Sequence, residues 1–309
     1  MTPELRRLIE VFGRDDKSGS FELARKALNI IRQAAVEIPG NLLREELVEV
    51  SKLILRSQPS MAAVINIVNR AALAVEKVGD YFNKTVIDAA LEELLEGFDR
   101  SAEETVANAV EKLSDFDRIA AYSRSSLVER ALLTLKDKKG SLSAAISEAR
   151  PGLEGVTLAA MLSGHGVKTE LCVDAALPGL IETCDALVVG ADAVGERSFS
   201  NKIGSGMMCK AAREKDIPVF VIAASDKFLT PPLRRFYKIL DRPAEEITGR
   251  LIPGIQVINR LFEWCDNKLV TAFIAGGETL SPIEVTGKLI TASISWTLEG
   301  IPDLNFRRV

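Results

Sequence analysis

The spacing of apolar side chains changes character near residue 115. Before that point, apolar residues recur every three or four positions, a period that places them along one face of an α-helix. Examples are Leu23, Ala27, Ile30, Ile31, Ala34 and Ile38, then Met61, Val64, Ile65, Val68 and Ala72, and the long acidic pattern from Tyr81 to Leu113. The pattern predicts a helical domain over residues 1–115.

From residue 116 onward, short apolar runs of strand length alternate with stretches of helical pattern. The runs cover residues 118–122, 141–146, 167–173, 186–189, 219–223 and 270–274, and helices are expected near 126–137, 154–163, 175–182 and 203–215. Such alternation favours a doubly wound α/β fold with a mostly parallel sheet, which we assign to residues 116–309. A last helix is predicted from Pro282 to about Leu298, and its wide apolar coverage suggests that part of it meets a partner.

The stretch Ala186 to Gly206 reads as strand, polar loop and helix. The strand Ala186 to Val189 is followed by Gly190-Ala191-Asp192, and the polar loop runs through Asn201 and Lys202 to a helix that starts near residue 203. In open parallel sheets, ligands bind outside the carboxyl ends of the strands, where loops and helix N-termini meet. Asp192 and Lys202 are therefore expected at such an edge.

Polar residues follow the other predicted strands as well. The segments are Tyr122-Ser123-Arg124-Ser125-Ser126, Ser147 to Gly152 with Arg150, Asp174, and Ser225-Asp226-Lys227. Guanidinium and ammonium groups near helix N-termini suit a phosphate dianion, and carboxylates suit sugar hydroxyls. The sequence predicts a pocket for a phosphorylated small molecule, formed by Ser123, Arg124, Arg150, Asp192, Asn201 and Lys202.

Composition narrows the classes of function. The formal net charge of −4 gives no general attraction to nucleic acid or to an anionic membrane, so neither is expected as a direct partner. The chain lacks an apolar run of about 18 residues and an N-terminal signal pattern, and we expect a cytoplasmic protein. Four scattered cysteines with one histidine, His165, predict free thiols and no metal site. Without the GxGxxG spacing, we expect no dinucleotide and no other cofactor.

Several of these motifs resemble one known family. It comprises the regulatory (alpha, beta and delta) subunits of translation initiation factor 2B, their archaeal relatives, and isomerases of methylthioribose 1-phosphate and ribose 1,5-bisphosphate. The resemblance rests on Ala121-Tyr122-Ser123-Arg124, Ser147-Glu148-Ala149-Arg150-Pro151, Gly190-Ala191-Asp192 and Asn201-Lys202-Ile203-Gly204-Ser205, together with Gly19 to Arg25, Gln58-Pro59-Ser60, Phe262-Glu263-Trp264 and Leu269-Val270-Thr271. It implies a helical N-terminal domain, a Rossmann-like C-terminal domain, and dimers or a larger assembly formed through the latter.

Two departures separate this chain from the isomerases that it resembles. Those enzymes place a catalytic cysteine after the first strand and pair it with the aspartate that matches Asp192, whereas this chain has Ala121 at the cysteine position. Alanine cannot transfer a proton, so the two-group mechanism loses one partner. The isomerases also carry an Arg-Gly-Ala-Gly phosphate loop, for which this chain has Ser18-Gly19-Ser20-Phe21. Both departures favour the regulatory-subunit side.

Three hypotheses follow from the sequence. The first is a non-catalytic protein that binds a sugar phosphate or AMP or GMP; the resemblance implies a regulatory-subunit-like role for it, with initiation factor 2 as a candidate partner. The second is an aldose-ketose sugar-phosphate isomerase in which Asp192 is catalytic and Asp174 or Asp226 supplies the second group. The third is a scaffold whose ancestral pocket is filled by its own side chains.

Overall fold

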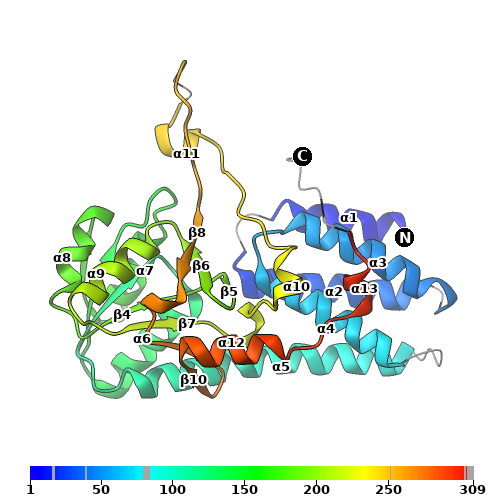
Figure 1. The fold of residues 1–309 in the computed structure, drawn as a ribbon, viewed down its shortest axis with the longest axis horizontal. Helices are drawn as coiled ribbons and strands as arrows, with labels where there is room; N and C mark the ends of the chain where they lie inside the picture. The colour runs from blue at the N-terminus through cyan, green and yellow to red at the C-terminus, as the bar shows by residue number, and fades with distance from the viewer. Residues whose placement is uncertain (16–17, 39, 79–83, 251, 303, 305–309) are drawn as a thin grey trace. The chain divides into compact units, whose positions relative to one another are not determined.

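The chain packs into two compact units in a computed structural model that describes residues 1–15, 18–38, 40–78, 84–250, 252–302 and 304 (Figure 1). The helical unit consists of Met1–Arg100, Asp226–Lys238 and Lys288–Val309, and the α/β unit consists of Ser101–Ser225 and Ile239–Gly287. Both units therefore combine segments that are distant in sequence. The domain boundary expected at residues 115 and 116 remains a prediction.

The helical unit is built from amphipathic helices whose apolar faces form its interior. Its helices are α1 (Pro3–Gly13), α2 (Ser20–Glu37), α3 (Gly40–Ser57), α4 (Ala62–Val78), the first part of α5 (Lys84–Lys112), α10 (Pro231–Arg234) and α13 (Trp296–Glu299). Leu23, Ala27 and Ile31 of α2 are fully buried, as the helical period predicts, and Leu28 is buried beside them. Tyr81, where the long helix was expected to begin, lies outside the described residues.

A seven-stranded sheet forms the centre of the α/β unit. Its strands are β1 (Arg118–Tyr122), β2 (Ser143–Ser147), β3 (Lys168–Cys172), β4 (Ala186–Val189), β7 (Val219–Ile222), β9 (Ala272–Ala275) and β10 (Glu278–Leu280). They are ordered β10-β9-β7-β4-β1-β2-β3, and all neighbours are parallel except β10 and β9. The predicted α/β fold with a mostly parallel sheet is confirmed.

The connecting helices and the strand register bring the strand ends to one edge. The helices are α6 (Ser126–Lys139), α7 (Glu154–Gly164), α8 (Leu177–Ile181), preceded by a short 3-10 turn at Asp174–Ala176, and α9 (Ser205–Glu214). Ala121 of β1 is in register with Ile146 of β2 and with Val188 of β4, so these three strands end level with one another. The strand order reverses at β1 and β4, which is where open α/β sheets bind ligands.

A second, three-stranded sheet corrects the prediction for residues 192–202. Antiparallel strands β5 (Ala193–Val194), β6 (Ser198–Lys202) and β8 (Phe262–Asp266) replace the expected polar loop. The Ser-Phe-Ser-Asn-Lys sequence of β6 has little strand character of its own, and its partner β8 lies far along the chain. Tertiary pairing therefore decides its conformation.

The predicted C-terminal helix is in fact two helices. Helix α12 covers Pro282–Ile290, and the separate helix α13 begins at Trp296. Ser295 is the N-cap of α13: its hydroxyl accepts the Thr297 N–H at 3.1 Å, and its own N–H donates to Asn69 Oδ1 at 2.9 Å. The apolar period continues across the break, which is why the pattern indicated one helix. A partner for this segment remains a prediction.

An arm, residues 239–261, links α10 to β8 and carries the short helix α11 (Glu245–Thr248) (Figure 1). Its two sides are joined where the Arg242 N–H donates to the Asn259 carbonyl at 2.7 Å.

Among the described helices of the whole chain, none combines the length and apolar character needed to cross a membrane.

A candidate ligand site at the strand ends

The loop after β1 is in close contact with the loop after β4. Ser123 has a φ of 63°, a left-handed conformation that is uncommon for a residue other than glycine. A Cβ on Gly190 would lie 2.6 Å from Ser125 Cβ, closer than real Cβ contacts allow. The glycine of Gly190-Ala191-Asp192 is therefore required for these two loops to meet.

Tyr122 joins the end of β1 to the turn before α9. Its hydroxyl donates to the Ile203 carbonyl at 2.5 Å. Gly204 has a φ of 100°, and a Cβ there would lie 2.3 Å from the Tyr122 hydroxyl. Burial raises the pKa of Tyr122, and nearby carboxylates add to the effect. The phenol is thus a structural hydrogen-bond donor with little capacity to act as a base.

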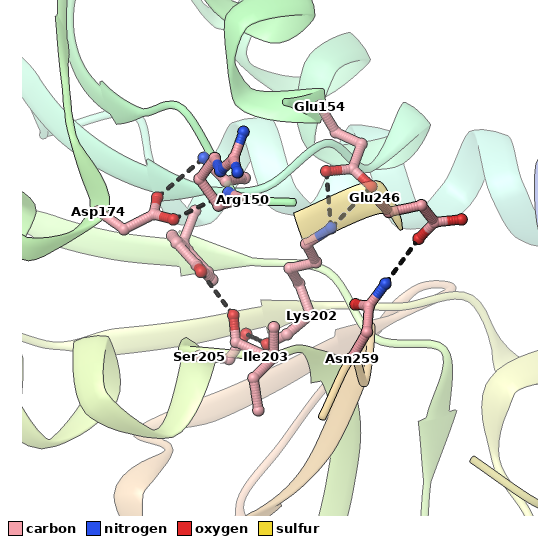
Figure 2. A network of polar contacts seen from close by, with 10 residues as sticks. Arg150, Glu154, Asp174, Lys202, Ile203, Ser205, Glu246 and Asn259 are labelled. Atoms are coloured by element: carbon pink, nitrogen blue, oxygen red, sulfur yellow. Dashed lines mark hydrogen bonds and ion pairs between the residues drawn. The ribbon is translucent and has the colours of Figure 1, made fainter. Parts of the chain in front are cut away.

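Lys202 is the most deeply buried cation of the predicted site. Its side chain is 3% exposed, and its Nζ lies 2.8 Å from each carboxylate oxygen of Glu154, the first residue of α7 (Figure 2). The Glu154 side chain is 36% exposed, so the carboxylate lies on the solvent side of the ammonium group. The chain itself supplies the counter-ion that was expected from a ligand.

Arg150 and Asp174 also meet, but through the Arg150 backbone. The Asp174 carboxylate accepts the N–H groups of Ala149 and Arg150, each at 2.8 Å (Figure 2). The exposed Arg150 guanidinium reaches the carbonyl of Ile247 in the arm at 3.4 Å. Asp174 therefore caps the loop after β2. Its role as the second acid-base group of an isomerase stays a prediction.

Arg124 is already engaged by a neighbouring carboxylate. Its Nε donates to Glu129 Oε2 at 2.7 Å, and the Arg124 side chain is 44% exposed. Arg124 lies just before Ser125, the N-cap of α6, and Glu129 lies in the first turn of that helix, so the pair holds the guanidinium close to the start of α6. We therefore expect Arg124 to contribute less to an anion site than Lys202.

The N-terminus of α9 is capped by protein groups. Glu263 Oε1 accepts the N–H groups of Gly204 and Gly206 at 2.9 and 2.8 Å. The buried Asn201 amide donates to Ser205 Oγ at 2.9 Å, and that hydroxyl donates to the Lys202 carbonyl at 2.6 Å. Asn201 is thus placed to support the turn, and an internal carboxylate stands at the helix end where a phosphate was expected.

Asp192 follows β4 as predicted and is half-buried. Its N–H donates to the Ser200 carbonyl at 2.8 Å, which places the residue beside β6 at the start of the three-stranded sheet. Asp226 and Lys227, in contrast, pack within the helical unit, where Asp226 is buried and Lys227 donates to Ser20 Oγ. Burial raises the pKa of Asp226.

The four cysteines are reduced thiols of low acidity. Cys184, Cys209 and Cys265 are buried and Cys172 is partly exposed. Burial is the largest cause of a raised pKa at every one of them. None has the depressed pKa of a nucleophilic or proton-transferring thiol.

Among the residues that the structure describes, the site offers no donor set suited to a metal ion. In the parts of the chain that the structure describes, no three histidine, cysteine, aspartate or glutamate side chains are grouped in a way that could hold one. A separate surface cavity of about 780 Å³ lies between α9 and β8 and is lined by Met207, Lys210, Glu214, Trp264 and Leu269, among others.

Sequence reasoning missed the two carboxylates that matter most here. Glu154 is an acidic residue in the first turn of a predicted helix, two positions after Arg150-Pro151-Gly152, but nothing in the local sequence pairs it with Lys202. Glu263 was visible in Phe262-Glu263-Trp264, yet its role depends on the pairing of β8 with β6. Both contacts are long-range.

The fold and these strand ends define a Rossmann-like α/β protein with a helical unit and a polar site at the switch point of its sheet. Residues 16–277 match the Initiation factor 2 subunit family, and the chain belongs to that family.

Two relatives and one solved structure illustrate the relationship. A translation initiation factor eIF-2B subunit 2-like protein of Pyrococcus furiosus is 24% identical over 89% of this chain and 95% of its own length. Ribose 1,5-bisphosphate isomerase of Methanocaldococcus jannaschii is 24% identical over 83% of this chain and 84% of its own length. The tetrameric eIF2B-beta2-delta2 complex of C. thermophilum gives a TM-score of 0.72 at 18% identity, covering 92% of each chain.

Proposed function

We propose that the chain is a non-catalytic, regulatory-subunit-like member of this family that binds a sugar phosphate or a nucleoside monophosphate at the strand ends. The absence of catalysis in this proposal is supported by the side chains at the end of β1. Ala121 is fully buried there, and the adjacent Tyr122 hydroxyl is committed to the Ile203 carbonyl. An isomerase needs a second proton-transferring group beside Asp192, and neither residue is one.

Three features support a bound anion. Lys202 has a buried stem and an ammonium group directed toward solvent-side Glu154, and the Arg150 guanidinium is exposed at the same edge (Figure 2). Ser123, Ala149 and Leu153 all have positive φ angles at the ends of β1 and β2. Backbone strain of this kind clusters at ligand sites. The isomerase relative is named for a sugar phosphate, which supports that ligand class.

In the proposed complex, the ligand phosphate contacts Lys202 and Arg150, and Asp192 takes a sugar hydroxyl. Asn201 supports the site through Ser205, while Ser123 and Arg124 border it. Charged hydrogen bonds of this type contribute about 1.5–3 kcal/mol each. Truncating Lys202 should therefore weaken binding at least tenfold.

The test is calorimetric titration with ribose 5-phosphate, ribose 1,5-bisphosphate, methylthioribose 1-phosphate, fructose 6-phosphate, AMP and GMP. The Lys202→Met variant keeps the apolar stem and should lose binding at least tenfold. The matched control is Lys215→Met, because Lys215 pairs with Glu182 in an exposed ion pair of the same unit. Equal affinity of wild type and Lys202→Met for every ligand that binds would refute this site.

The isomerase alternative is tested on the same samples by following each ligand with 31P NMR. A non-catalytic protein leaves the ligand unchanged, whereas a product peak that disappears in Asp192→Asn would establish turnover.

We also propose that the α/β unit contacts a second copy or a partner subunit. A solution mass by light scattering equal to one chain would contradict self-association.

A further inference from the structure

The ion pair between Lys202 and Glu154 is asymmetric. The lysine side chain is 3% exposed and is enclosed by protein atoms. The glutamate side chain is 36% exposed, so a change of rotamer can move its carboxylate into solvent. The two residues lie on different elements, β6 and α7 (Figure 2). A group arriving from solvent would therefore meet Glu154 first and reach Lys202 by displacing it.

The backbone that carries Glu154 is held firmly, so movement is confined to its side chain. A Cβ on Gly155 would lie 1.7 Å from the Ser147 carbonyl oxygen, so α7 begins directly against the end of β2. The Leu153 N–H donates to the Ala149 carbonyl at 3.0 Å. Gly152 leaves space for the carboxylate, because a Cβ there would lie 2.5 Å from Glu154 Oε1.

Glu154 differs from the other two internal carboxylates of the site. Asp174 and Glu263 each accept two backbone N–H groups, which would lose their acceptors if the carboxylate moved. Both oxygens of Glu154 instead accept from the single Lys202 ammonium group. A phosphate oxygen offers that ammonium the same charge and the same kind of hydrogen bond.

We propose that Glu154 is a built-in competitor for the Lys202 ammonium group, which a phosphorylated ligand must displace to bind. This inference rests on the proposed ligand site and adds its regulation. The displaced carboxylate moves to solvent, where it is rehydrated, and the phosphate takes its place on Lys202. Glu154 therefore lowers the affinity for phosphate-bearing ligands and leaves the affinity for neutral sugars unchanged.

The test compares Glu154→Gln with wild type by calorimetric titration of ribose 5-phosphate and of ribose. The amide keeps the shape of the side chain and removes its charge. We expect ribose 5-phosphate to bind about tenfold more tightly, about 1.4 kcal/mol, with ribose unaffected. The gain should disappear in the double variant Glu154→Gln/Lys202→Met. Glu182→Gln, which removes an equivalent carboxylate from the exposed pair with Lys215, should change nothing.

A second variant moves the carboxylate without changing any charge. In Gly152→Ala, the new methyl group must push Glu154 away from its present position, so ribose 5-phosphate should again bind more tightly, by a smaller factor. Circular dichroism and the melting temperature show whether each variant is folded.

The outcomes separate this inference from the proposed function. If wild type binds ribose 5-phosphate through Lys202 and Glu154→Gln binds it equally well, the competitor role is wrong and the site remains. If Glu154→Gln binds and wild type does not, the competitor role is supported and the wild-type site is closed to this probe. If neither protein binds it, both proposals fail for this sugar phosphate.

Discussion

Two sets of ion pairs, one in the helical unit and one in the α/β unit, differ in how deeply the cation is buried. In the helical unit, Arg32 of α2 pairs with Asp88 and Glu92 of α5, and all three side chains are at least 36% exposed. In the α/β unit, Lys202 is 3% exposed and lies at the end of a strand. Exposed pairs contribute little to stability, whereas a buried charge is costly unless it is paired. The comparison indicates that the exposed pairs of α2 and α5 add little to the stability of the helical unit, and it singles out Lys202 as a charge of the proposed site.

The two units also differ in how tightly their backbones approach. In the α/β unit, Gly155, Gly190 and Gly204 lie where any Cβ would overlap a neighbouring atom. In the helical unit, nothing lies within 4 Å of the Cβ position of Gly19, and a Cβ on Gly13 would lie 3.2 Å from the Ser57 side chain, a milder contact. The loops at the strand ends of the α/β unit are thus closely packed. We expect Gly→Ala substitutions at these positions to lower the free energy of unfolding more than those in the helical unit.

The largest expected effect is that of Gly155→Ala. The methyl group would lie 1.7 Å from the Ser147 carbonyl oxygen, so α7 or the end of β2 must move. We expect a loss of at least about 3 kcal/mol in the free energy of unfolding, measured by urea titration. Gly164→Ala at the other end of α7 is the matched control, because nothing lies within 4 Å of its Cβ position. It should be neutral or stabilise by up to about 1 kcal/mol.

A smaller effect is expected from Cys209 in alkaline solution. Burial raises the pKa of its thiol from 9.0 to about 12. Below pH 9 the thiol is protonated in both the folded and the unfolded chain, so its ionisation takes nothing from the free energy of unfolding. Between about pH 9 and 12 the unfolded chain releases the proton while the folded chain keeps it, so this group lowers the free energy of unfolding by about 1.4 kcal/mol per pH unit.

The measurement is urea unfolding of wild type and Cys209→Ala at several pH values between about 8, where the thiol is protonated in both states, and about 11. Subtracting the two curves removes the titration of all other groups. The stability of wild type relative to the variant should decrease as the pH rises through this range. A difference that stays constant would mean that Cys209 is not protected from ionisation. All four cysteines belong to the α/β unit, so this sensitivity distinguishes the two units.

The smallest expected effect belongs to the surface pairs of the helical unit. Arg32→Ala removes both ion pairs to α5, and we expect the melting temperature to change by no more than about 2 °C. Leu28→Ala, at a fully buried position of the same helix, is the contrasting variant. It should lower the melting temperature by more than Arg32→Ala does. A large effect of Arg32→Ala would overturn the idea that apolar faces dominate this unit.

The sequence was sufficient wherever a local pattern decided the structure. The period of Leu23, Ala27 and Ile31 specified a helix with a buried face, and the runs 118–122 and 186–189 specified β1 and β4 with the bounds that the structure shows. The family motifs and the strand-end location of the polar residues were also readable. These features depend on neighbours within a few positions, which the sequence displays directly.

Contacts between residues that are distant in the chain could not be predicted from the sequence. The strand β6 exists because β8 pairs with it, and the helix break before α13 is fixed by Ser295 and Asn69. The counter-ion of Lys202 is Glu154, which is placed by the packing of Gly155 against β2. The sequence by itself determined the fold class, the family and the chemical groups of the site. The tertiary structure decided which charges neutralise one another, because that depends on distances between residues far apart in the chain.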